Sequence, residues 1–184
     1  MESLRYAGFQ AASILTTTGF VTTDYETWPG LSQAVLFLLM FVGACSGSTG
    51  GGMKVIRIVT LIKQGWKELK YLIYPKAVFQ IKLNGHMIRA DIIHAIFGFV
   101  FLYLFLIMLT TFVVSTGGND ILIFLSTSLV TLGNIGPGFG KIGPSGNYAF
   151  YPSDIKWFLS FIMMAGRLEV YTVLVLFTPT FWKR

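Results

Sequence analysis

Long apolar stretches alternate with short polar segments along this chain. Residues 92–114 contain one histidine and no charged side chain, and at ~1.5 Å per residue they span about 34 Å, enough to cross a hydrocarbon core of ~30 Å. Residues 157–177 form a second candidate span. Residues 31–44 are too short alone, and they cross a membrane only if the chain continues past the next glycines into residues 55–62. The pattern predicts an all-α integral membrane protein.

The composition and the distribution of charge support this prediction. Of the 184 residues, 54% are hydrophobic and 12% are charged, whereas about a quarter of an ordinary globular protein is charged. Eight basic residues and one acidic residue lie between residues 54 and 89. Because cytoplasmic loops of membrane proteins carry an excess of Lys and Arg, we expect residues 63–89 and the C-terminus in the cytoplasm. These flanks account for the net charge of +6, so no nucleic-acid partner is expected.

The sequence lacks the patterns of common catalytic and metal sites. It has one cysteine, Cys45, and its two histidines, His86 and His94, have no Cys or carboxylate partners at a metal-ligand spacing. The glycine-rich stretch CSGSTGGGMK at residues 45–54 does not fit a nucleotide-binding P-loop, because Met53 stands where that motif needs lysine. We therefore expect neither an enzyme nor a cofactor on this chain.

The two halves of the chain resemble each other. Each has a short helix-like segment, a glycine turn, a polar linker and an apolar segment, in that order. The turns read TTTGF and NIGPG, and the apolar segments end in LFLLMFVG and LSFIMMAG. Gly19 and Gly43 are 24 residues apart, whereas Gly136 and Gly166 are 30 apart, so six additional residues fall in the second linker. Weak internal symmetry of this kind is typical of transport proteins.

Each short helix-like segment predicts a re-entrant helix. About twelve residues are too few to cross a bilayer, so such a segment enters the membrane and returns. Irregular backbone at that depth has to be buried in protein or to line a watery cavity. The negative ends of both helix dipoles would point at this cavity, and Gly19 and Gly136 would permit backbone angles that turn carbonyls inward. Carbonyls and helix C-termini in this arrangement suit a dehydrated monovalent cation.

The predicted cation ligands are backbone groups of two filter turns. A monovalent cation would be bound by the carbonyl oxygens of Thr17, Thr18, Asn134 and Ile135, and Gly19 and Gly136 complete the turns. The alternative is that both turns are ordinary extracellular loops whose glycines only reverse the chain. Two turns at the same place relative to an apolar segment favour the filter, because lipid does not tolerate exposed irregular backbone.

Four motifs in order resemble the TrkH-type subunit of bacterial Trk potassium uptake systems, within the Trk/Ktr/HKT superfamily of cation transporters. They are TTTGF, GACSGSTGGGMKVIR, NIGPGFG and GRLEVYTVLVLFTP, and they cover essentially the whole chain. The resemblance implies four helix–pore-loop–helix repeats with re-entrant pore helices, similar to the pore module of voltage-gated ion channels. Residues 1–64 would hold the third pore loop and its broken inner helix, residues 65–90 a basic cytoplasmic linker, and residues 91–184 the complete fourth repeat.

The resemblance also implies partners and a location. The protein would be a multi-pass protein of the bacterial inner membrane, in contact with the lipid bilayer and with the remaining repeats of the subunit. It would form a homodimer and sit on a cytoplasmic, nucleotide-binding regulatory ring of the TrkA type. The basic stretch at residues 63–89 is available for docking this ring, but contact with anionic lipid explains it equally well. K⁺ would be the transported ion.

The glycine-rich stretch predicts a break in a membrane helix, since each glycine costs about 1 kcal/mol relative to alanine. In the family that the chain resembles, this place is an intramembrane loop beneath the filter that is thought to gate the pore. The expected gating residues are Gly47, Ser48, Thr49, Gly50, Gly51 and Gly52. The alternative is a simple kinked helix.

Arg167 is the expected barrier in the ion path. It follows Gly166 in the middle of an apolar segment, and the internal repeat places it level with the start of the glycine-rich stretch. A cation at that depth usually faces a bundle interior or a watery cavity. Arg167 would donate hydrogen bonds to loop carbonyls; the alternative is that it pairs with a helix outside this pore.

Three functions remain open from the sequence. The leading prediction is potassium transport, with this chain as the translocating subunit or a C-terminal part of it. The second is a sodium-permeable or Na⁺-coupled transporter of the Ktr/HKT kind. The third is a non-conducting, truncated membrane fragment without an ion site. Because half a filter cannot surround an ion, this chain alone is not expected to conduct.

Overall fold

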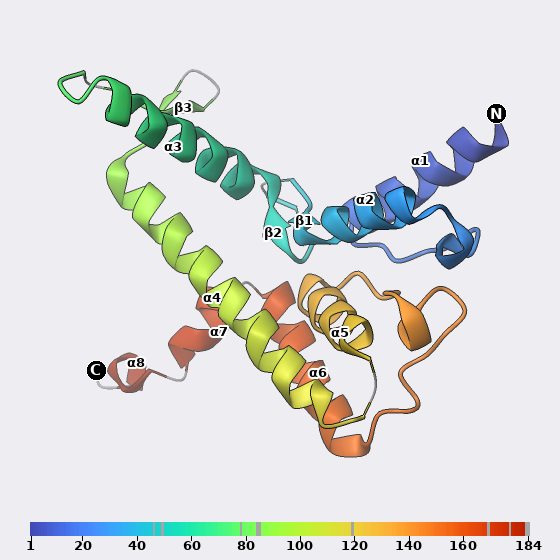
Figure 1. Ribbon diagram of the computed structural model, residues 1–184. Helices are drawn as coiled ribbons and strands as arrows, with labels where there is room; N and C mark the ends of the chain where they lie inside the picture. The colour runs from blue at the N-terminus through green and yellow to red at the C-terminus, as the bar shows by residue number, and fades with distance from the viewer. Residues whose placement is uncertain are drawn as a thin grey trace.

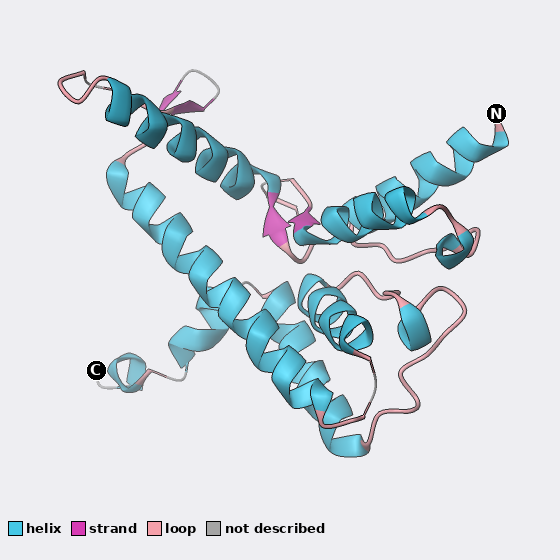
Figure 2. Cartoon of the chain, in the orientation of Figure 1, coloured by secondary structure: helices cyan, strands magenta, loops and turns pink. Residues whose placement is uncertain are grey.

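The computed structural model describes residues 1–45, 47–48, 50–77, 79–83, 86–118, 120–168, 170–176 and 178–182. Most of them are helical, and the strands among them are short two-residue segments (Figure 2). The elements are α1 (Glu2–Leu15), η1 (Tyr25–Thr27), α2 (Gly30–Phe41), β1 (Val42–Gly43), β2 (Met53–Lys54), α3 (Val55–Ile73), β3 (Lys82–Leu83), β4 (His86–Met87), α4 (Ala90–Ser115), α5 (Ile121–Gly133), η2 (Gly140–Ile142), α6 (Ser153–Arg167), α7 (Val170–Leu176) and α8 (Pro179–Trp182).

The first apolar segment is interrupted where the glycines predict a break. Helix α2 ends at Phe41 and helix α3 begins at Val55. Strands β1 and β2 pair in parallel between them, with Val42 opposite Met53. Because the pairing is parallel, the chain leaves the loop in the direction in which it entered, and α3 continues away from α2 on the far side of the break (Figure 1).

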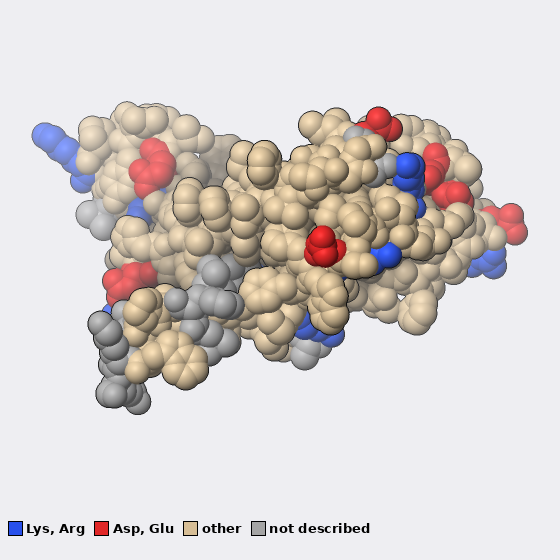
Figure 3. Space-filling model, turned by 90° about the horizontal axis from the view of Figure 1, so that it is seen from below, with Lys and Arg blue, Asp and Glu red and all other residues tan. Residues whose placement is uncertain are grey.

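Helix α4 is the long apolar helix that the sequence predicts. Among the described residues it is the one helix long and apolar enough to cross a membrane, and its mean hydropathy reaches 2.6. Phe101, Met108 and Phe112 on this helix are each at least 70% exposed. Exposed apolar surface of this extent suits contact with lipid. Figure 3 shows one face of the molecule, on which most atoms belong to uncharged residues.

Residues 157–177 do not form the single span that the sequence predicts. Helix α6 ends at Arg167 and α7 begins at Val170. The break follows Gly166, whose Cα lies against the backbone carbonyl of Leu132 so closely that a side chain would not fit. Since glycine is the weakest helix former after proline, the helix ends where it meets the end of α5.

The connection between the halves is more helical than the sequence indicates. The predicted boundary between residues 64 and 65 lies inside α3, which continues to Ile73. A small hairpin of β3 and β4 follows, with Lys82 opposite Met87. The chain then enters α4. The division of the chain into parts of two repeats and a linker stays a prediction.

Helix α5 lies at the centre of the packed region. It packs against α4, α6 and α2, and ten of its thirteen residues are buried. By contrast, three of the fourteen residues of α1 are buried. The apolar core joins both halves of the chain, because Ile14 and Met40 belong to the same buried cluster as Leu129, Leu132 and Ile162. This shared core holds the ends of α1 and α5 close to one another.

Candidate cation site

Helix α1 ends in a left-handed turn. The N–H of Thr17 donates to the carbonyl of Ile14, and the N–H of Thr18 donates to the carbonyl of Ser13, both at 3.0 Å. Thr17 itself has φ 53°. This combination of bonds around one left-handed residue is a Schellman motif, which satisfies carbonyls at the end of a helix.

Helix α5 ends in the same way. The N–H of Asn134 donates to the carbonyl of Thr131 at 3.2 Å, and the N–H of Ile135 donates to the carbonyl of Val130 at 3.0 Å. Asn134 has φ 54°. Each of these residues stands 117 positions after its counterpart in the α1 turn, so the internal repeat seen in the sequence extends to individual hydrogen bonds.

The left-handed conformation of Thr17 is strained. Outside glycine, this region is occupied mainly by Asn and Asp, and a β-branched residue there is an outlier. The steric cost is about 1–2 kcal/mol. Strain of this kind persists only where the surroundings enforce it, and it is concentrated at functional sites. Asn134, in the second turn, is a residue type that tolerates the same conformation.

Two residues further on, each turn has a glycine with positive φ, 78° at Gly19 and 104° at Gly136. The residues between, Thr18 and Ile135, are not left-handed. In a regular strand successive residues face opposite sides. Alternation between positive and negative φ instead turns successive carbonyls toward one side. This backbone geometry suits a row of carbonyls that face an ion.

The two turns meet. A Cβ on Gly19 would collide with the carbonyl oxygen of Ile135 and would lie 3.2 Å from Cδ of Pro137. A Cβ on Gly136 would lie 3.9 Å from Cα of Gly19. The structure therefore brings together all the residues predicted for the filter, which are Thr17, Thr18, Gly19, Asn134, Ile135 and Gly136.

A pocket of about 330 Å³ opens on one side of these turns. Gly19 and Gly136 line it, together with the segments that follow them in the chain, including Phe20, Pro137 and Tyr148. The pocket leads directly to the two filter glycines. The opposite side of the turns faces the C-terminal ends of α1 and α5, where the helix dipoles place partial negative charge.

The glycine-rich loop lies against those helix ends. Gly51 is buried, and its Cα approaches the backbone carbonyl of Gly133. A Cβ on Gly50 would lie 3.3 Å from Oγ1 of Thr17. Of the residues predicted for the gate, Gly50, Gly51 and Gly52 therefore lie against the ends of α1 and α5, whereas Gly47 and Ser48 are exposed. Their role in gating stays a prediction. Thr49, also expected in the gate, lies outside the described residues.

Arg167 lies at the level of the loop but is not joined to it. Its neighbour Gly166 contacts the end of α5, which Gly51 also approaches. The side chain of Arg167 is exposed, and no hydrogen bond connects it to the part of the loop that the structure describes. Its role as a barrier stays a prediction.

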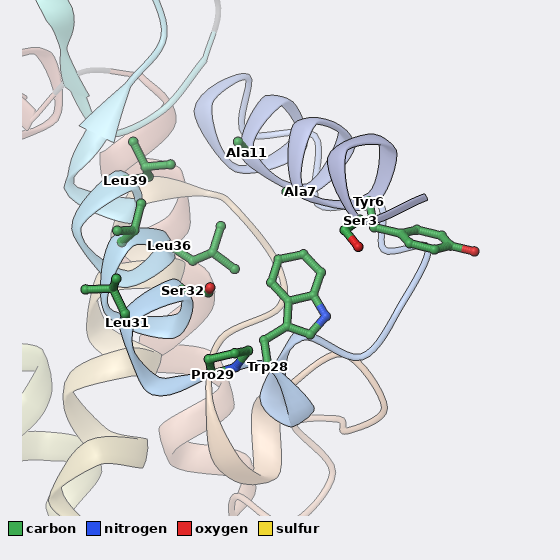
Figure 4. A pocket seen from close by; sticks show the side chains of 11 residues that line it. Ser3, Tyr6, Ala7, Ala11, Trp28, Pro29, Leu31, Ser32, Leu36 and Leu39 are labelled. Carbon is green, nitrogen blue, oxygen red and sulfur yellow. The ribbon is translucent and has the colours of Figure 1, made fainter. Parts of the chain in front are cut away.

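A larger groove, of about 640 Å³, lies between α1 and α2 (Figure 4). The indole of Trp28 stands between the two helices, near the aliphatic side chain of Leu36. No residue of the two filter turns lines this groove, and most of its lining is apolar. Its lining therefore does not suit a cation.

Two tyrosines at the site were not identified from the sequence. The hydroxyl of Tyr148 donates to the carbonyl of Gly136 at 2.7 Å, and the hydroxyl of Tyr25 donates to the carbonyl of Gly138 at 2.6 Å. The linkers that contain them read YETWP at residues 25–29 and YAFYP at residues 148–152. This second internal repeat, just before each inner helix, is the signal that points to them.

A membrane-length helix, two re-entrant helices and two matched carbonyl turns define a part of a pore-loop membrane transport protein. A family profile described as a cation transport protein, TrkH, matches residues 2–184. The chain belongs to the TrkH family. This finding confirms the resemblance noted in the sequence and the all-α membrane fold.

The related proteins agree with this assignment. The chain is 45% identical to the Trk system potassium uptake protein TrkH of Halomonas elongata and 42% identical to that of Escherichia coli, in both cases over 184 residues, which are 100% of this chain and 38% of the relative. It is also similar to the crystal structure of the potassium transporter TrkH from Vibrio parahaemolyticus, with a TM-score of 0.89 and 40% identity over 99% of this chain and 38% of that chain. The chain thus spans less than two fifths of these relatives.

Proposed function

We propose that this chain contributes two of the carbonyl turns of a potassium-translocating subunit in a Trk-type uptake system. The observation that carries the proposal is the matched pair of left-handed turns at the ends of α1 and α5, which meet at Gly19. Both relatives described above are potassium uptake proteins, which favours K⁺ over Na⁺ as the transported ion.

In this proposal the backbone binds the ion. The carbonyl oxygens of Thr17, Thr18, Asn134 and Ile135 replace part of the hydration shell of K⁺. The C-terminal ends of α1 and α5 add negative potential at the same place. The loop at residues 47–52 closes the path beneath the filter, and Arg167 raises the electrostatic barrier there.

The proposal includes partners that complete the pore. Two turns do not surround an ion, so the remaining repeats of the subunit supply the other ligands. The subunit lies in the bacterial inner membrane, with residues 63–89 and the C-terminus in the cytoplasm, where Lys and Arg are favoured. It forms a homodimer and contacts a nucleotide-binding regulatory ring of the TrkA type through its basic cytoplasmic side.

A chimera tests the proposal. Residues 1–184 replace the matching segment of the Halomonas elongata relative, and K⁺ and Na⁺ uptake are measured in cells that lack their own K⁺ uptake. We expect saturable K⁺ uptake with a clear preference over Na⁺. A relative from which the segment is deleted is the control, and it should not transport.

Two outcomes would contradict the proposal. Equal uptake of Na⁺ and K⁺ would favour a sodium-permeable transporter. A chimera that reaches the membrane in normal amount but transports neither ion would favour a non-conducting fragment.

A further inference from the structure

The segment that follows the second filter turn is tied to its surroundings by hydrogen bonds at successive residues. The carbonyl of Gly136 accepts from Tyr148 at 2.7 Å. The N–H of Gly138 donates to the carbonyl of Ile142 at 2.8 Å, and the N–H of Phe139 donates to Oγ of Ser126 at 2.7 Å. Few peptide groups of this segment are free to rotate.

One of the ties crosses from the first half of the chain to the second. The hydroxyl of Tyr25 donates to the carbonyl of Gly138 at 2.6 Å, over a sequence separation of 113 residues. The next residue, Glu26, accepts a hydrogen bond from the N–H of Gly140. The ring of Tyr25 also packs edge-on against Phe139, with ring centroids 5.3 Å apart. The linker that contains Tyr25 and Glu26 in the first half therefore holds residues 138–140, which follow the filter turn of the second half.

Both tyrosine hydroxyls are suited to act as fixed donors. Tyr25 is fully buried and Tyr148 is half-buried. Burial raises the pKa of both phenols above the ordinary value for tyrosine, and the nearby Glu26 raises that of Tyr25 further. Both side chains are therefore protonated at neutral pH, and each donates its single proton to a carbonyl.

A carbonyl held by such a donor cannot swing freely. Rotation of the peptide that follows Gly136 would break the bond to Tyr148 and lose the stabilisation that this hydrogen bond supplies. The carbonyl of Ile135 belongs to the adjoining peptide, and it is one of the proposed ion ligands. Fixing the Gly136 carbonyl therefore limits how far the Ile135 carbonyl can turn.

We propose that Tyr25 and Tyr148 are positioning residues for the cation filter, which hold the carbonyls of Gly138 and Gly136 in fixed orientations. This inference rests on the proposed function, because it assumes that the adjoining carbonyls bind K⁺. Tyr148 bonds to the turn of its own half of the chain, at Gly136. Tyr25 bonds from the first half to Gly138 in the second half.

Tyr148→Phe and Tyr25→Phe in the chimera test the inference. Phenylalanine keeps the ring and removes only the donor, so packing is retained. The readouts are the maximal K⁺ uptake rate and the preference for K⁺ over Na⁺, measured by competition. The preference is a ratio, so it does not depend on the amount of folded protein. We expect it to fall about two- to tenfold in Tyr148→Phe, the factor that one hydrogen bond of ordinary strength supports.

Tyr25→Phe should also lower the preference for K⁺, but by less. The carbonyl that Tyr25 holds belongs to Gly138, which lies two residues beyond Gly136 in the chain. The maximal rate should change less than about twofold in both variants, since a carbonyl is released and none of the ion ligands is removed.

Tyr103→Phe is the matched control. Tyr103 lies on α4 and is as deeply buried as Tyr25, but its hydroxyl has no hydrogen-bond partner among the described residues. The Tyr103→Phe variant should show the same preference for K⁺ as the unmodified chimera. The inference is overturned if Tyr148→Phe keeps the unmodified preference, or if Tyr103→Phe loses as much. Failure of the unmodified chimera to transport K⁺ would instead overturn the proposed function.

Discussion

The two re-entrant units have the same helix ends but different surroundings. Thr17 and Asn134 share one backbone conformation and one pattern of hydrogen bonds. Helix α5, however, is enclosed by α2, α4 and α6, whereas most residues of α1 are accessible. The two turns therefore share one backbone conformation, although their helices are packed differently within this chain.

The difference in burial between α1 and α5 can be followed at individual positions. Ala7 and Ala11 line the groove between α1 and α2, and their counterparts 117 residues later are Phe124 and Ser128, which are buried. Ser128 also accepts a hydrogen bond from Thr111 of α4 at 2.9 Å. The first unit has no counterpart of α4 within the described residues. Small side chains at these positions leave room for another apolar helix.

The largest difference between the units should appear on replacing the filter glycines. Gly19→Val places a side chain against the carbonyl of Ile135, whereas the same change at Gly136 meets only Cα of Gly19, at 3.9 Å. Both also force a β-branched residue to positive φ. We expect a loss of K⁺ preference of about 100-fold for Gly19→Val and about tenfold for Gly136→Val, from strain of ~1–3 kcal/mol per site with an added clash in the first. Competition between K⁺ and Na⁺ uptake in the chimera measures both.

Expression should change less than selectivity in these variants, because the strain is confined to the turn. Gly8→Val is a suitable control, since a Cβ there has nothing within 4 Å. Normal discrimination in Gly19→Val would show that the filter assignment is wrong.

The glycine-rich loop is the second difference between the units. The inner helix of the first unit is interrupted by it, whereas the second unit has Arg167 at the same level. If the loop is a gate with two states, deleting residues 50–52 or replacing Arg167 by Ala should raise K⁺ flux. The rise should be about tenfold at most, if the open state is already populated at roughly 10%. Rb⁺ uptake into liposomes measures it.

A matched pair of single substitutions sharpens this test. Gly51→Ala puts a methyl group against the carbonyl of Gly133 and should push the loop away from the filter. Gly47→Asn is the control, because a Cβ at Gly47 meets nothing within 4 Å and asparagine tolerates its φ of 85°. Reduced or unchanged uptake in the deletion and in Arg167→Ala, at normal protein yield, would show that the loop is a static kink.

The sequence predicted those parts of the fold that depend on local signals. Apolar length identified α4, and a run of glycines identified the break between α2 and α3. The two carbonyl turns were located because each follows a short helix-like segment and precedes a polar linker and an apolar segment. In each case the deciding residues are close together in the chain, so the pattern could be recognised without knowing the packing.

The missed features depend on contacts between distant segments. The end of α6 after Arg167 follows from the close approach of Gly166 to Leu132, which composition does not reveal. The bond from Tyr25 to Gly138 joins residues 113 positions apart. The left-handed Thr17 contradicts the ordinary preference of a β-branched residue, so propensity alone would have assigned it elsewhere.

Exchanging the two left-handed residues should have a moderate effect on stability, and in opposite directions. Thr17→Asn relieves the strain at the end of α1 and should stabilise the chimera by about 1 kcal/mol. Asn134→Thr introduces that strain at the end of α5 and removes the bond from Nδ2 of Asn134 to the carbonyl of Met163, 2.8 Å long. It should destabilise by about 2 kcal/mol. The melting temperatures of both variants in detergent measure the change, and shifts of the same sign would contradict the equivalence of the two turns.

The smallest effect should come from a bond that the first turn has and the second lacks. Oγ of Ser13 donates to the carbonyl of Phe20 at 2.7 Å, whereas the counterpart of Ser13 is Val130, which has no donor in its side chain. Ser13→Val makes the first unit like the second and should lower stability by about 1 kcal/mol, the usual contribution of one hydrogen bond. K⁺ preference should change less than about twofold, because Phe20 lies outside the predicted ligands and the second turn is formed without such a bond. Val130→Ser is the reciprocal control, and it should not gain stability, since a buried serine in a helix bonds to its own preceding turn. A loss of preference in Ser13→Val as large as that in Gly136→Val would show that the strand after Gly19 takes part in ion selection.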